Sequence, residues 1–301
     1  MPKTDNKHRN PFRSGFVAIL GAPNVGKSTL LNRLLDQKIS ITSKKPQTTR
    51  NRILGVLHRP GAQLVFLDTP GVHRSQKPLN VRIVDVALAT LSEVDLVLLL
   101  TDVSSPDPES ERILLRHLKK ETVPVILVLN KIDLIPKPRL LELIESWSQA
   151  HNFEALVPIS ATQGTQVDTL IAAMEAVMPP GPPFFPEESL TDMPQRFIAA
   201  EMIREKAFRL TGEELPYAIA VTVDTFSETA KLVKIHATIH VERDSQKGII
   251  IGKKGAKLKQ IGESARKDIE AMVGCKVFLK LFVRVQKNWS RDTKALRKFG
   301  Y

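Results

Sequence analysis

The feature that most constrains the fold is a series of aliphatic runs of strand length between Phe16 and Met178. Continuous apolar runs predict strands that are buried on both faces, and their alternation with helical stretches predicts a largely parallel sheet between two layers of helices. We therefore expect a mixed, mostly parallel six-stranded α/β sheet with helices on both faces. Its strands are predicted in FVAIL, RILGVL, AQLVFLDT, VDLVLLLTDV, PVILVLNKID and ALVPISA.

A proline-rich segment separates this region from the rest of the chain. MPPGPPFFPEE begins at Met178 and holds five prolines, which cannot continue a helix or pair inside a sheet. Beyond it the predicted order is a helix, two strands, a helix that leads into a glycine loop, another helix and a strand. This order is typical of a small α+β domain. We predict a polar tail at 1–14, the α/β domain at 15–178, the linker at 179–192 and the α+β domain at 193–301.

The charge of the chain points to a polyanionic partner. The 301 residues carry a formal net charge of +12, which suits a nucleic acid or an anionic membrane surface. The N-terminus lacks an apolar signal segment and the aliphatic runs are shorter than a membrane span, so we expect a cytoplasmic protein. Cys275 is the single cysteine, which excludes an internal disulfide. His236 and His240 share a predicted strand face, and we interpret them as structural.

A complete phosphate-loop motif follows the first predicted strand. GAPNVGKS at 21–28 matches G-x-x-x-x-G-K-[ST] and opens a predicted helix, so its backbone N–H groups would face phosphate oxygens. Lys27 would bind the β- and γ-phosphates and the Ser28 hydroxyl would bind Mg²⁺. The predicted nucleotide contacts of this loop are Gly21, Ala22, Pro23, Asn24, Val25, Gly26, Lys27, Ser28 and Thr29.

Three later motifs close predicted strands, namely DTPG at 68–71, NKID at 130–133 and ISA at 159–161, and the last two identify the base. In DTPG, Asp68 would hold Mg²⁺ through water and Gly71 would lie near the γ-phosphate. In NKID, Asp133 can accept hydrogen bonds from N1–H and the exocyclic amine of guanine, a donor pair that adenine lacks. The sequence thus predicts GTP and GDP as ligands, with further contacts from Thr69, Pro70, Val72, Asn130, Lys131, Ser160 and Ala161.

A polar, threonine-rich segment, ISITSKKPQTTRNRILG, is typical of a switch loop that becomes ordered around γ-phosphate and Mg²⁺. We predict Thr49 as the switch threonine on Mg²⁺, with Thr48 as the alternative. The four motifs together resemble the translation-factor-related P-loop GTPases. PNVGKS, PQTTR and DTPGVH resemble the bacterial Era family more specifically.

The residue after DTPG bears on hydrolysis. Ras-like enzymes place a water-orienting glutamine there, whereas this chain has Val72. Related GTPases with an apolar residue at this position often use a potassium ion held by the asparagine that Asn24 matches, so K⁺ is a predicted cofactor. The predicted catalytic residues are Lys27, Asn24, Thr49, Gly71 and Val72.

A second glycine loop stands in the α+β domain. IIIGKKGAKLKQIG lacks the elements that wrap a triphosphate, but I-G-K-K-G fits the GXXG loop of a KH domain, which clamps about four nucleotides of a single strand. No acidic residue stands between Asp244 and Glu263. The element order resembles a type II KH domain, and VERDSQKG also resembles Era. The predicted RNA contacts are Lys247, Ile251, Gly252, Lys253, Lys254, Gly255, Lys257 and Lys259.

The resemblance to the Era family covers about Gly15 to Arg297. It implies a monomeric GTP-controlled switch that binds the single-stranded 3′ end of small-subunit ribosomal RNA and assists assembly of the small (30S) ribosomal subunit and 16S rRNA maturation. It also implies a peripheral fraction at the inner membrane. The basic C-terminal tail could contact either the ribosome or that membrane surface, or it could be a solvated helix end. Two alternatives stay open, namely a GTP-regulated adaptor at the inner membrane and a GTP-dependent RNA-modification factor.

Overall fold

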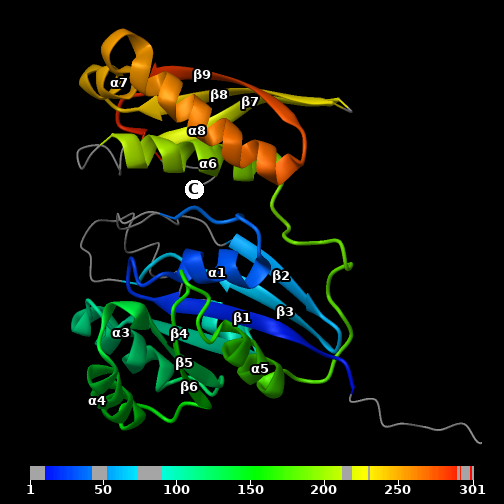
Figure 1. Ribbon diagram of the computed structural model, residues 1–301, viewed down its shortest axis with the longest axis vertical. Helices are drawn as coiled ribbons and strands as arrows, with labels where there is room; N and C mark the ends of the chain where they lie inside the picture. The colour runs from blue at the N-terminus through cyan, green and yellow to red at the C-terminus, as the bar shows by residue number, and fades with distance from the viewer. Residues whose placement is uncertain are drawn as a thin grey trace, which may run out of the picture.

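Two domains, one above the other, make up the computed structural model (Figure 1). It describes residues 11–42, 53–72, 90–211, 219–229 and 231–289, together with residues 292 and 299. The first domain is a sheet with helices on both faces, and the second is a smaller sheet with its own helices. None of the helices within these ranges is long and apolar enough to cross a membrane.

The first domain confirms the six predicted strands. In chain order its elements are β1 (Arg13–Gly21), α1 (Lys27–Leu35), β2 (Ile53–Arg59), β3 (Ala62–Asp68), η1 (Thr90–Glu93), β4 (Leu96–Asp102), α3 (Pro108–Leu118), β5 (Val125–Asn130), η2 (Ile132–Leu134), α4 (Lys137–Ser148), β6 (Ala155–Ile159) and α5 (Val167–Val177). The sheet order is β2-β3-β1-β4-β5-β6. Only β2 runs antiparallel to its neighbour, because Pro60 and Gly61 make a two-residue hairpin between Arg59 and Ala62.

Both faces of this sheet are buried, as the aliphatic runs predicted. Alternate residues of β1 illustrate the division: Val17 and Ile19 pack with α1 and α5, whereas Ala18 and Leu20 pack with α3 and α4. Because parallel strands end at the same edge, the loops after β1, β3, β5 and β6 gather there. This edge is where the predicted nucleotide motifs lie.

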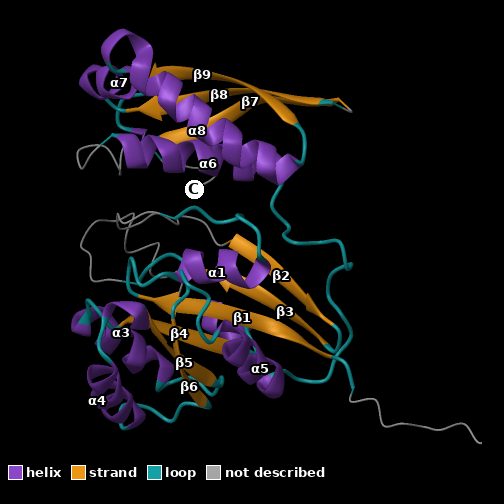
Figure 2. Cartoon of the chain, in the orientation of Figure 1, coloured by secondary structure: helices purple, strands orange, loops and turns teal. Residues whose placement is uncertain are grey.

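The second domain contains α6 (Gln195–Leu210), β7 (Ala220–Thr229), β8 (Leu232–Val241), α7 (Asp244–Ile251), η4 (Lys253–Gly255), α8 (Ala256–Val273) and β9 (Lys276–Val285). Its sheet order is β7-β8-β9, with β7 antiparallel and β9 parallel to β8. This is the element order predicted for a type II KH domain. The helices pack on one face of the sheet (Figure 2). On this face Val233, Ile235 and Ala237 of β8 are buried.

The domain boundaries differ from the prediction in one detail. Arg13 and Ser14, which the sequence placed in the polar tail, belong to β1, because they continue its parallel pairing with β3, opposite Ala62 and Gln63. Arg13 forms a β-bridge with Pro180, and the Ser14 amide donates to the Pro179 carbonyl at 3.1 Å. The proline-rich segment therefore begins beside the first residues of β1, a central strand of the first sheet.

The rest of the linker also lies on the first domain. The Gln63 side chain accepts from the Phe184 amide at 2.6 Å and donates to the Phe185 carbonyl at 2.8 Å. Further along, the Val56 amide of β2 donates to the Leu190 carbonyl at 2.9 Å. The linker is thus bound along the β2 side of the sheet.

Candidate functional site

The loop between β1 and α1 has the conformation that its glycines permit. Gly26 caps α1 with φ 103°, a left-handed conformation that favours glycine. A Cβ at this position would lie 2.3 Å from the Asn130 side-chain nitrogen, so the close approach also requires glycine. Asn130 donates to the Val25 carbonyl at 2.7 Å and thereby ties the loop to the end of β5. The phosphate loop is therefore built jointly by its own glycine and by an asparagine 104 positions away.

Lys27 lies inside this loop. Its side chain is 6% exposed, and its ammonium donates to the carbonyls of Gly21 at 3.0 Å and Ala22 at 2.8 Å. Burial lowers the pKa of Lys27 to about 8, although the charge of Asp68 opposes this shift. A buried cation with only carbonyl partners gains strongly from an anion, and a phosphate oxygen is such an anion.

Asp68 organises the metal side of the site. It is fully buried at the end of β3, and its Oδ2 accepts from the Ser28 hydroxyl at 2.8 Å and the Ser40 hydroxyl at 2.9 Å. Burial raises the pKa of Asp68, although Lys27 and the two hydroxyls oppose this. Its Oδ1 has no hydrogen-bond partner among the described residues.

This donor set fits magnesium. Mg²⁺ takes oxygen ligands, prefers one or two protein groups plus water and phosphate, and is attracted to an unsatisfied buried carboxylate oxygen. Ser28 and Asp68 would hold the ion directly or through water, as the sequence predicted. Ser40, which the sequence did not single out, is a further hydroxyl on the same carboxylate. The other predicted ligand, Thr49, and its alternative, Thr48, lie outside the described residues.

The DTPG turn packs against the phosphate loop. The Thr69 hydroxyl donates to the Ile19 carbonyl at 2.8 Å, and a Cβ at Gly71 would meet the Pro23 backbone at 2.8 Å. The Val72 amide donates to the Gly21 carbonyl at 3.1 Å, while its side chain is buried in the core. Val72 therefore offers no side chain to the phosphate side of the turn.

The base-side motifs also meet at this edge. The Lys131 ammonium forms an ion pair with Asp102. Burial opposes ionisation of Asp102, but the hydrogen bonds from Lys131 and Ser104 outweigh it and hold its pKa below the usual range. Asp133, on η2, is exposed and available to a ligand. The position of Lys131 is thus fixed before any base binds.

Two residues of this region have structural roles that sequence reasoning missed. Asn130, predicted to reach the base, uses both ends of its amide within the protein: besides Val25, it accepts from the Ala161 amide at 3.0 Å. Arg33 of α1 donates to the carbonyls of Ala161 at 3.2 Å and Thr162 at 2.6 Å. The motif NKID gave a signal for Asn130, whereas nothing in the α1 sequence marks Arg33.

The GXXG loop joins α7 to α8. Gly252 has φ 70°, and a Cβ there would meet the Lys257 Cβ at 2.7 Å, so the turn requires glycine. Lys254 at φ 50° and Gly255 at φ 78° are also left-handed, which turns the exposed Lys253 and Lys254 side chains out of the fold. Ile250 and Ile261 are fully buried behind the loop and belong to the core. The other predicted contacts Lys247, Ile251 and Lys257 are half-buried, and Lys259 is exposed.

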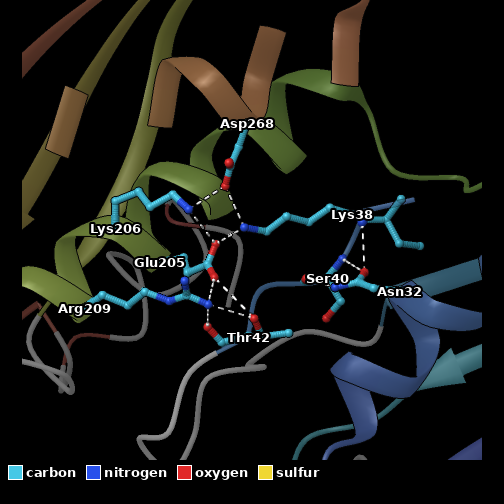
Figure 3. Close-up of polar contacts among 9 residues, drawn as sticks. Asn32, Lys38, Ser40, Thr42, Glu205, Lys206, Arg209 and Asp268 are labelled. Carbon is cyan, nitrogen blue, oxygen red and sulfur yellow. Dashed lines mark hydrogen bonds and ion pairs between the residues drawn. The ribbon is translucent and has the colours of Figure 1, made fainter. Parts of the chain in front are cut away.

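A cluster of charges joins the two domains (Figure 3). Lys38, which follows α1, donates to Glu205 of α6 at 2.5 Å and to Asp268 of α8 at 2.6 Å. Glu205 also binds Arg209 at 2.6 Å, and Lys206 binds Asp268 at 2.5 Å. Burial lowers the pKa of Lys38, but the two carboxylates outweigh it and raise the pKa overall. We call these five residues the interdomain cluster.

The interdomain cluster is connected to the metal side of the site. Between Lys38 and Thr42 lies Ser40, whose hydroxyl binds Asp68 and whose amide donates to Asn32 of α1 at 2.9 Å. Thr42 donates to Glu205 at 3.3 Å. One short segment, residues 38–42, therefore contacts both the metal-side carboxylate and the second domain. Figure 3 shows its contacts with the second domain.

Comparison with known proteins identifies both domains. A family profile described as 50S ribosome-binding GTPase matches residues 16–131, and a KH domain profile matches residues 214–290. The GTPase Era of Geotalea uraniireducens is 55% identical over 291 residues, covering 96% of this chain and 98% of that protein. The GTPase Era of Geobacter metallireducens is 56% identical over 294 residues, covering 97% and 99%.

Solved structures agree over the whole length. Era in complex with MgGDPNP and nucleotides 1506–1542 of 16S ribosomal RNA superposes with a TM-score of 0.91 at 43% identity, covering 96% of this chain and 99% of that one. A point variant of Aquifex aeolicus Era bound to GDP.AlF4- gives a TM-score of 0.92 at 42% identity, with the same coverage. With the nucleotide motifs and the GXXG loop in place, the chain belongs to the Era family of GTPases.

Proposed function

We propose that this GTPase binds GTP at the edge of its first sheet, hydrolyses it, and binds the single-stranded 3′ end of 16S ribosomal RNA through its GXXG loop. In this role it assists assembly of the small ribosomal subunit. The observation that carries the proposal is the pair of glycine loops in one chain, one enclosing a buried lysine and one presenting exposed lysines. The RNA in the solved Era complex supports this choice of partner.

The residues of the first loop suit binding and positioning. Lys27 would exchange its carbonyl partners for β- and γ-phosphate oxygens, and the loop N–H groups would orient the phosphates. Mg²⁺ held near Ser28 and Asp68 supplies charge neutralisation on the phosphate oxygens. Asp133 selects guanine by accepting its paired N–H donors.

The base assignment gives the first test. Asp133→Asn replaces one acceptor by a donor and should shift preference from guanosine towards xanthosine nucleotides, since xanthine presents an oxygen where guanine presents an amine. Titration of the purified protein with fluorescent GTP and XTP measures both affinities, and Asp168→Asn, at an exposed residue in the first turn of α5, is the matched control. Unchanged GTP affinity in Asp133→Asn would contradict the assignment.

The RNA assignment is tested separately. A single-stranded RNA with the 3′-terminal sequence of 16S ribosomal RNA should bind more tightly than a scrambled RNA of equal length at fixed salt. Equal affinity for the two RNAs would show that the protein binds RNA through charge alone, without sequence specificity, and would contradict the proposed partner.

We further propose that K⁺ assists hydrolysis near Asn24. Asn24 is exposed on the phosphate loop at φ 66°, and the Val72 side chain is buried away from the phosphates, so another group must act on the attacking water. Turnover should be faster in potassium than in sodium, and Asn24→Ala should remove the difference. Equal turnover in both salts would reject this cofactor.

For location, we propose a cytoplasmic monomer with a peripheral fraction at the inner membrane, supported by the formal charge of +12. Co-sedimentation with anionic but not neutral vesicles is the expected result. No pelleting with anionic vesicles at low salt would oppose the membrane contact.

A further inference from the structure

The sheet of the KH domain has a face that the GXXG loop does not use. The helices cover the side formed by Val233, Ile235 and Ala237. Because successive side chains of a strand point to opposite faces, Lys234 and His236 of β8 lie on the other side, as do the alternate residues of β9. Toward the end of β8 this side is covered, because the ring centroid of Phe299 lies 4.5 Å from that of His240 and Phe299 packs on the buried Trp289. We call the uncovered part of this side, around Lys234, His236 and the alternate residues of β9, the open face.

Two exposed aromatic side chains stand on the open face. Phe278 is 51% exposed and Phe282 is 44% exposed, while their neighbours Val277, Leu279, Leu281 and Val283 turn toward the core. His236 lies between them, with ring centroids 6.3 Å from Phe278 and 6.4 Å from Phe282. Three rings in a row at the surface contribute little to the core, and such a patch indicates an interaction site.

The charge around these rings is basic. Lys234 pairs across the sheet with Phe278, and Lys276, Lys280 and Arg284 alternate with the two phenylalanines along β9; all four are exposed. The ammonium of Lys280 lies 5.2 Å from the Phe282 ring centroid. Asp224, an acidic residue on the same face, accepts hydrogen bonds from Thr222 at 3.3 Å and Thr238 at 2.6 Å. Aromatic rings interleaved with cations favour a ligand that carries both flat rings and negative charge.

We propose that the open face is a second RNA-binding surface, on which unpaired bases stack on Phe278 and Phe282 while the surrounding lysines and arginine bind phosphates. This inference rests on the proposed RNA binding of the KH domain and extends it. A GXXG loop clamps only about four nucleotides, so a longer single strand needs further contacts. Stacking requires unpaired bases, so the surface selects single strands over duplex RNA.

The position of β9 gives the RNA a route between the two surfaces. β9 is an edge strand, and it contacts α7, which leads into the GXXG loop. Since β8 and β9 are parallel and α7 follows the end of β8, Arg284 lies at the GXXG end of the open face and Phe278 at the far end. A strand that leaves the loop would pass the edge of β9 and meet Arg284, then Phe282, then Phe278.

Lys280 does not block this surface. A cation over an exposed ring is held more weakly than a stacked base, so a base can displace the ammonium from Phe282. The displaced ammonium then becomes available to a phosphate of the same nucleotide chain. The contact seen in the free protein is thus replaced by two contacts with RNA.

The test uses the full chain with Phe278→Leu and Phe282→Leu combined. Leucine keeps an apolar side chain but removes the ring face, and both positions are exposed, so thermal unfolding should be unchanged. Phe184→Leu, at a linker residue that is 52% exposed, is the matched control. The probes are a 20-nucleotide single-stranded RNA, a five-nucleotide fragment that fills only the GXXG loop, and a duplex of the same sequence.

We expect the double variant to lose about tenfold or more in affinity for the 20-nucleotide RNA, with no change for the five-nucleotide fragment or GTP. A 2-aminopurine base in the longer RNA should be quenched by stacking on the wild type and less so on the variant. The control should bind all probes as the wild type does. If the double variant unfolds, Lys234→Glu with Arg284→Glu tests the same face, and a salt dependence reduced for the longer RNA is expected.

Three outcomes overturn the inference. The double variant could bind the longer RNA normally while Lys253→Glu with Lys254→Glu weakens that binding. In that case the open face does not bind RNA and the GXXG assignment holds. If the variant loses only binding to anionic vesicles, the face contacts membrane. If the wild type binds neither RNA, the proposed RNA function itself fails.

Discussion

The phosphate loop and the GXXG loop share their ingredients but differ in where they place the lysine. In each, a left-handed glycine, Gly26 or Gly255, caps the helix that follows, and a lysine stands beside it. Lys27 is buried and bound to carbonyls, whereas Lys253 and Lys254 are exposed. The same local sequence chemistry thus gives an enclosed site in one domain and an open site in the other.

The difference teaches that the surroundings of a loop, more than its motif, set what it binds. The phosphate loop is closed by Asn130 from the end of β5 and by Asp68 and Gly71 from the end of β3, so an anion would bind at one fixed place. The GXXG loop has Lys257 of its own helix as its close neighbour. It can therefore accept a polymer that enters and leaves on both sides.

The largest effect expected from this comparison is that of Lys27→Ala. Removing a buried cation from phosphate should cost about 3 kcal/mol or more, which is over a hundredfold in GTP affinity. RNA affinity in the absence of nucleotide should stay within about twofold. Calorimetric titration with GTP and with single-stranded RNA measures both affinities. GTP binding retained by Lys27→Ala would show that the buried lysine does not set what the phosphate loop binds.

The two capping glycines should respond differently to alanine. Gly26→Ala forces a Cβ against Asn130 at 2.3 Å besides the left-handed strain, whereas a Cβ at Gly255 would meet nothing within 4 Å. We expect about 3 kcal/mol of lost unfolding free energy for the first and about 1 kcal/mol for the second. Chemical denaturation of both variants checks this. Equal losses would show that strain alone governs both caps.

Reversing the charge of the open loop gives a smaller, salt-dependent effect. Lys253→Glu with Lys254→Glu should weaken single-stranded RNA binding by about tenfold at low salt. It should also reduce the slope of log affinity against log salt by about 1.4, since two fewer counterion releases accompany binding. Lys137→Glu with Arg139→Glu on α4 is the control for net charge. An unchanged slope would show that the RNA phosphates do not contact Lys253 and Lys254.

The smallest effect concerns the interdomain cluster. Burial raises the pKa of Asp268, but the hydrogen bonds from Lys206 and Lys38 outweigh it and hold it below 3.8. Such a carboxylate stabilises the domain contact above its ordinary pKa, and this stabilisation is lost as pH falls through the lowered value. The pKa of Lys38 is raised above 10.5. Its stabilisation of the domain contact is therefore complete below pH 10.5 and is lost as pH rises through the raised value.

The contact between the domains should therefore be constant from about pH 5 to 9 and weaken in acid. Lys38→Ala should weaken it by about 1 kcal/mol at neutral pH, because the pairs are partly exposed and screened. Fluorescence transfer between labels on α4 and β7 reports the distance, with Lys120→Ala as a control. If the transfer efficiency were the same in Lys38→Ala, the cluster would not hold the domains together.

The strands and the motif residues could be predicted from sequence because they depend on local signals. Aliphatic runs located all six strands of the first domain, and the phosphate-loop pattern located Lys27 and Ser28. The contacts that close the site depend on residues far apart in the chain. Arg33, Ser40 and the second role of Asn130 come from how strand ends meet in three dimensions, and no short pattern encodes them.

The proline-rich linker has a consequence for solubility. β2 is an edge strand, and an edge strand with free amides can pair with the same strand of another molecule. The Val56 amide is already paired with the Leu190 carbonyl, and the Thr191 hydroxyl caps the Leu54 carbonyl at 2.6 Å. Any event that detaches this segment, including proteolysis near Leu190, would bare the edge and favour aggregation of the first domain. The connection between the domains thus also protects one of them from self-association.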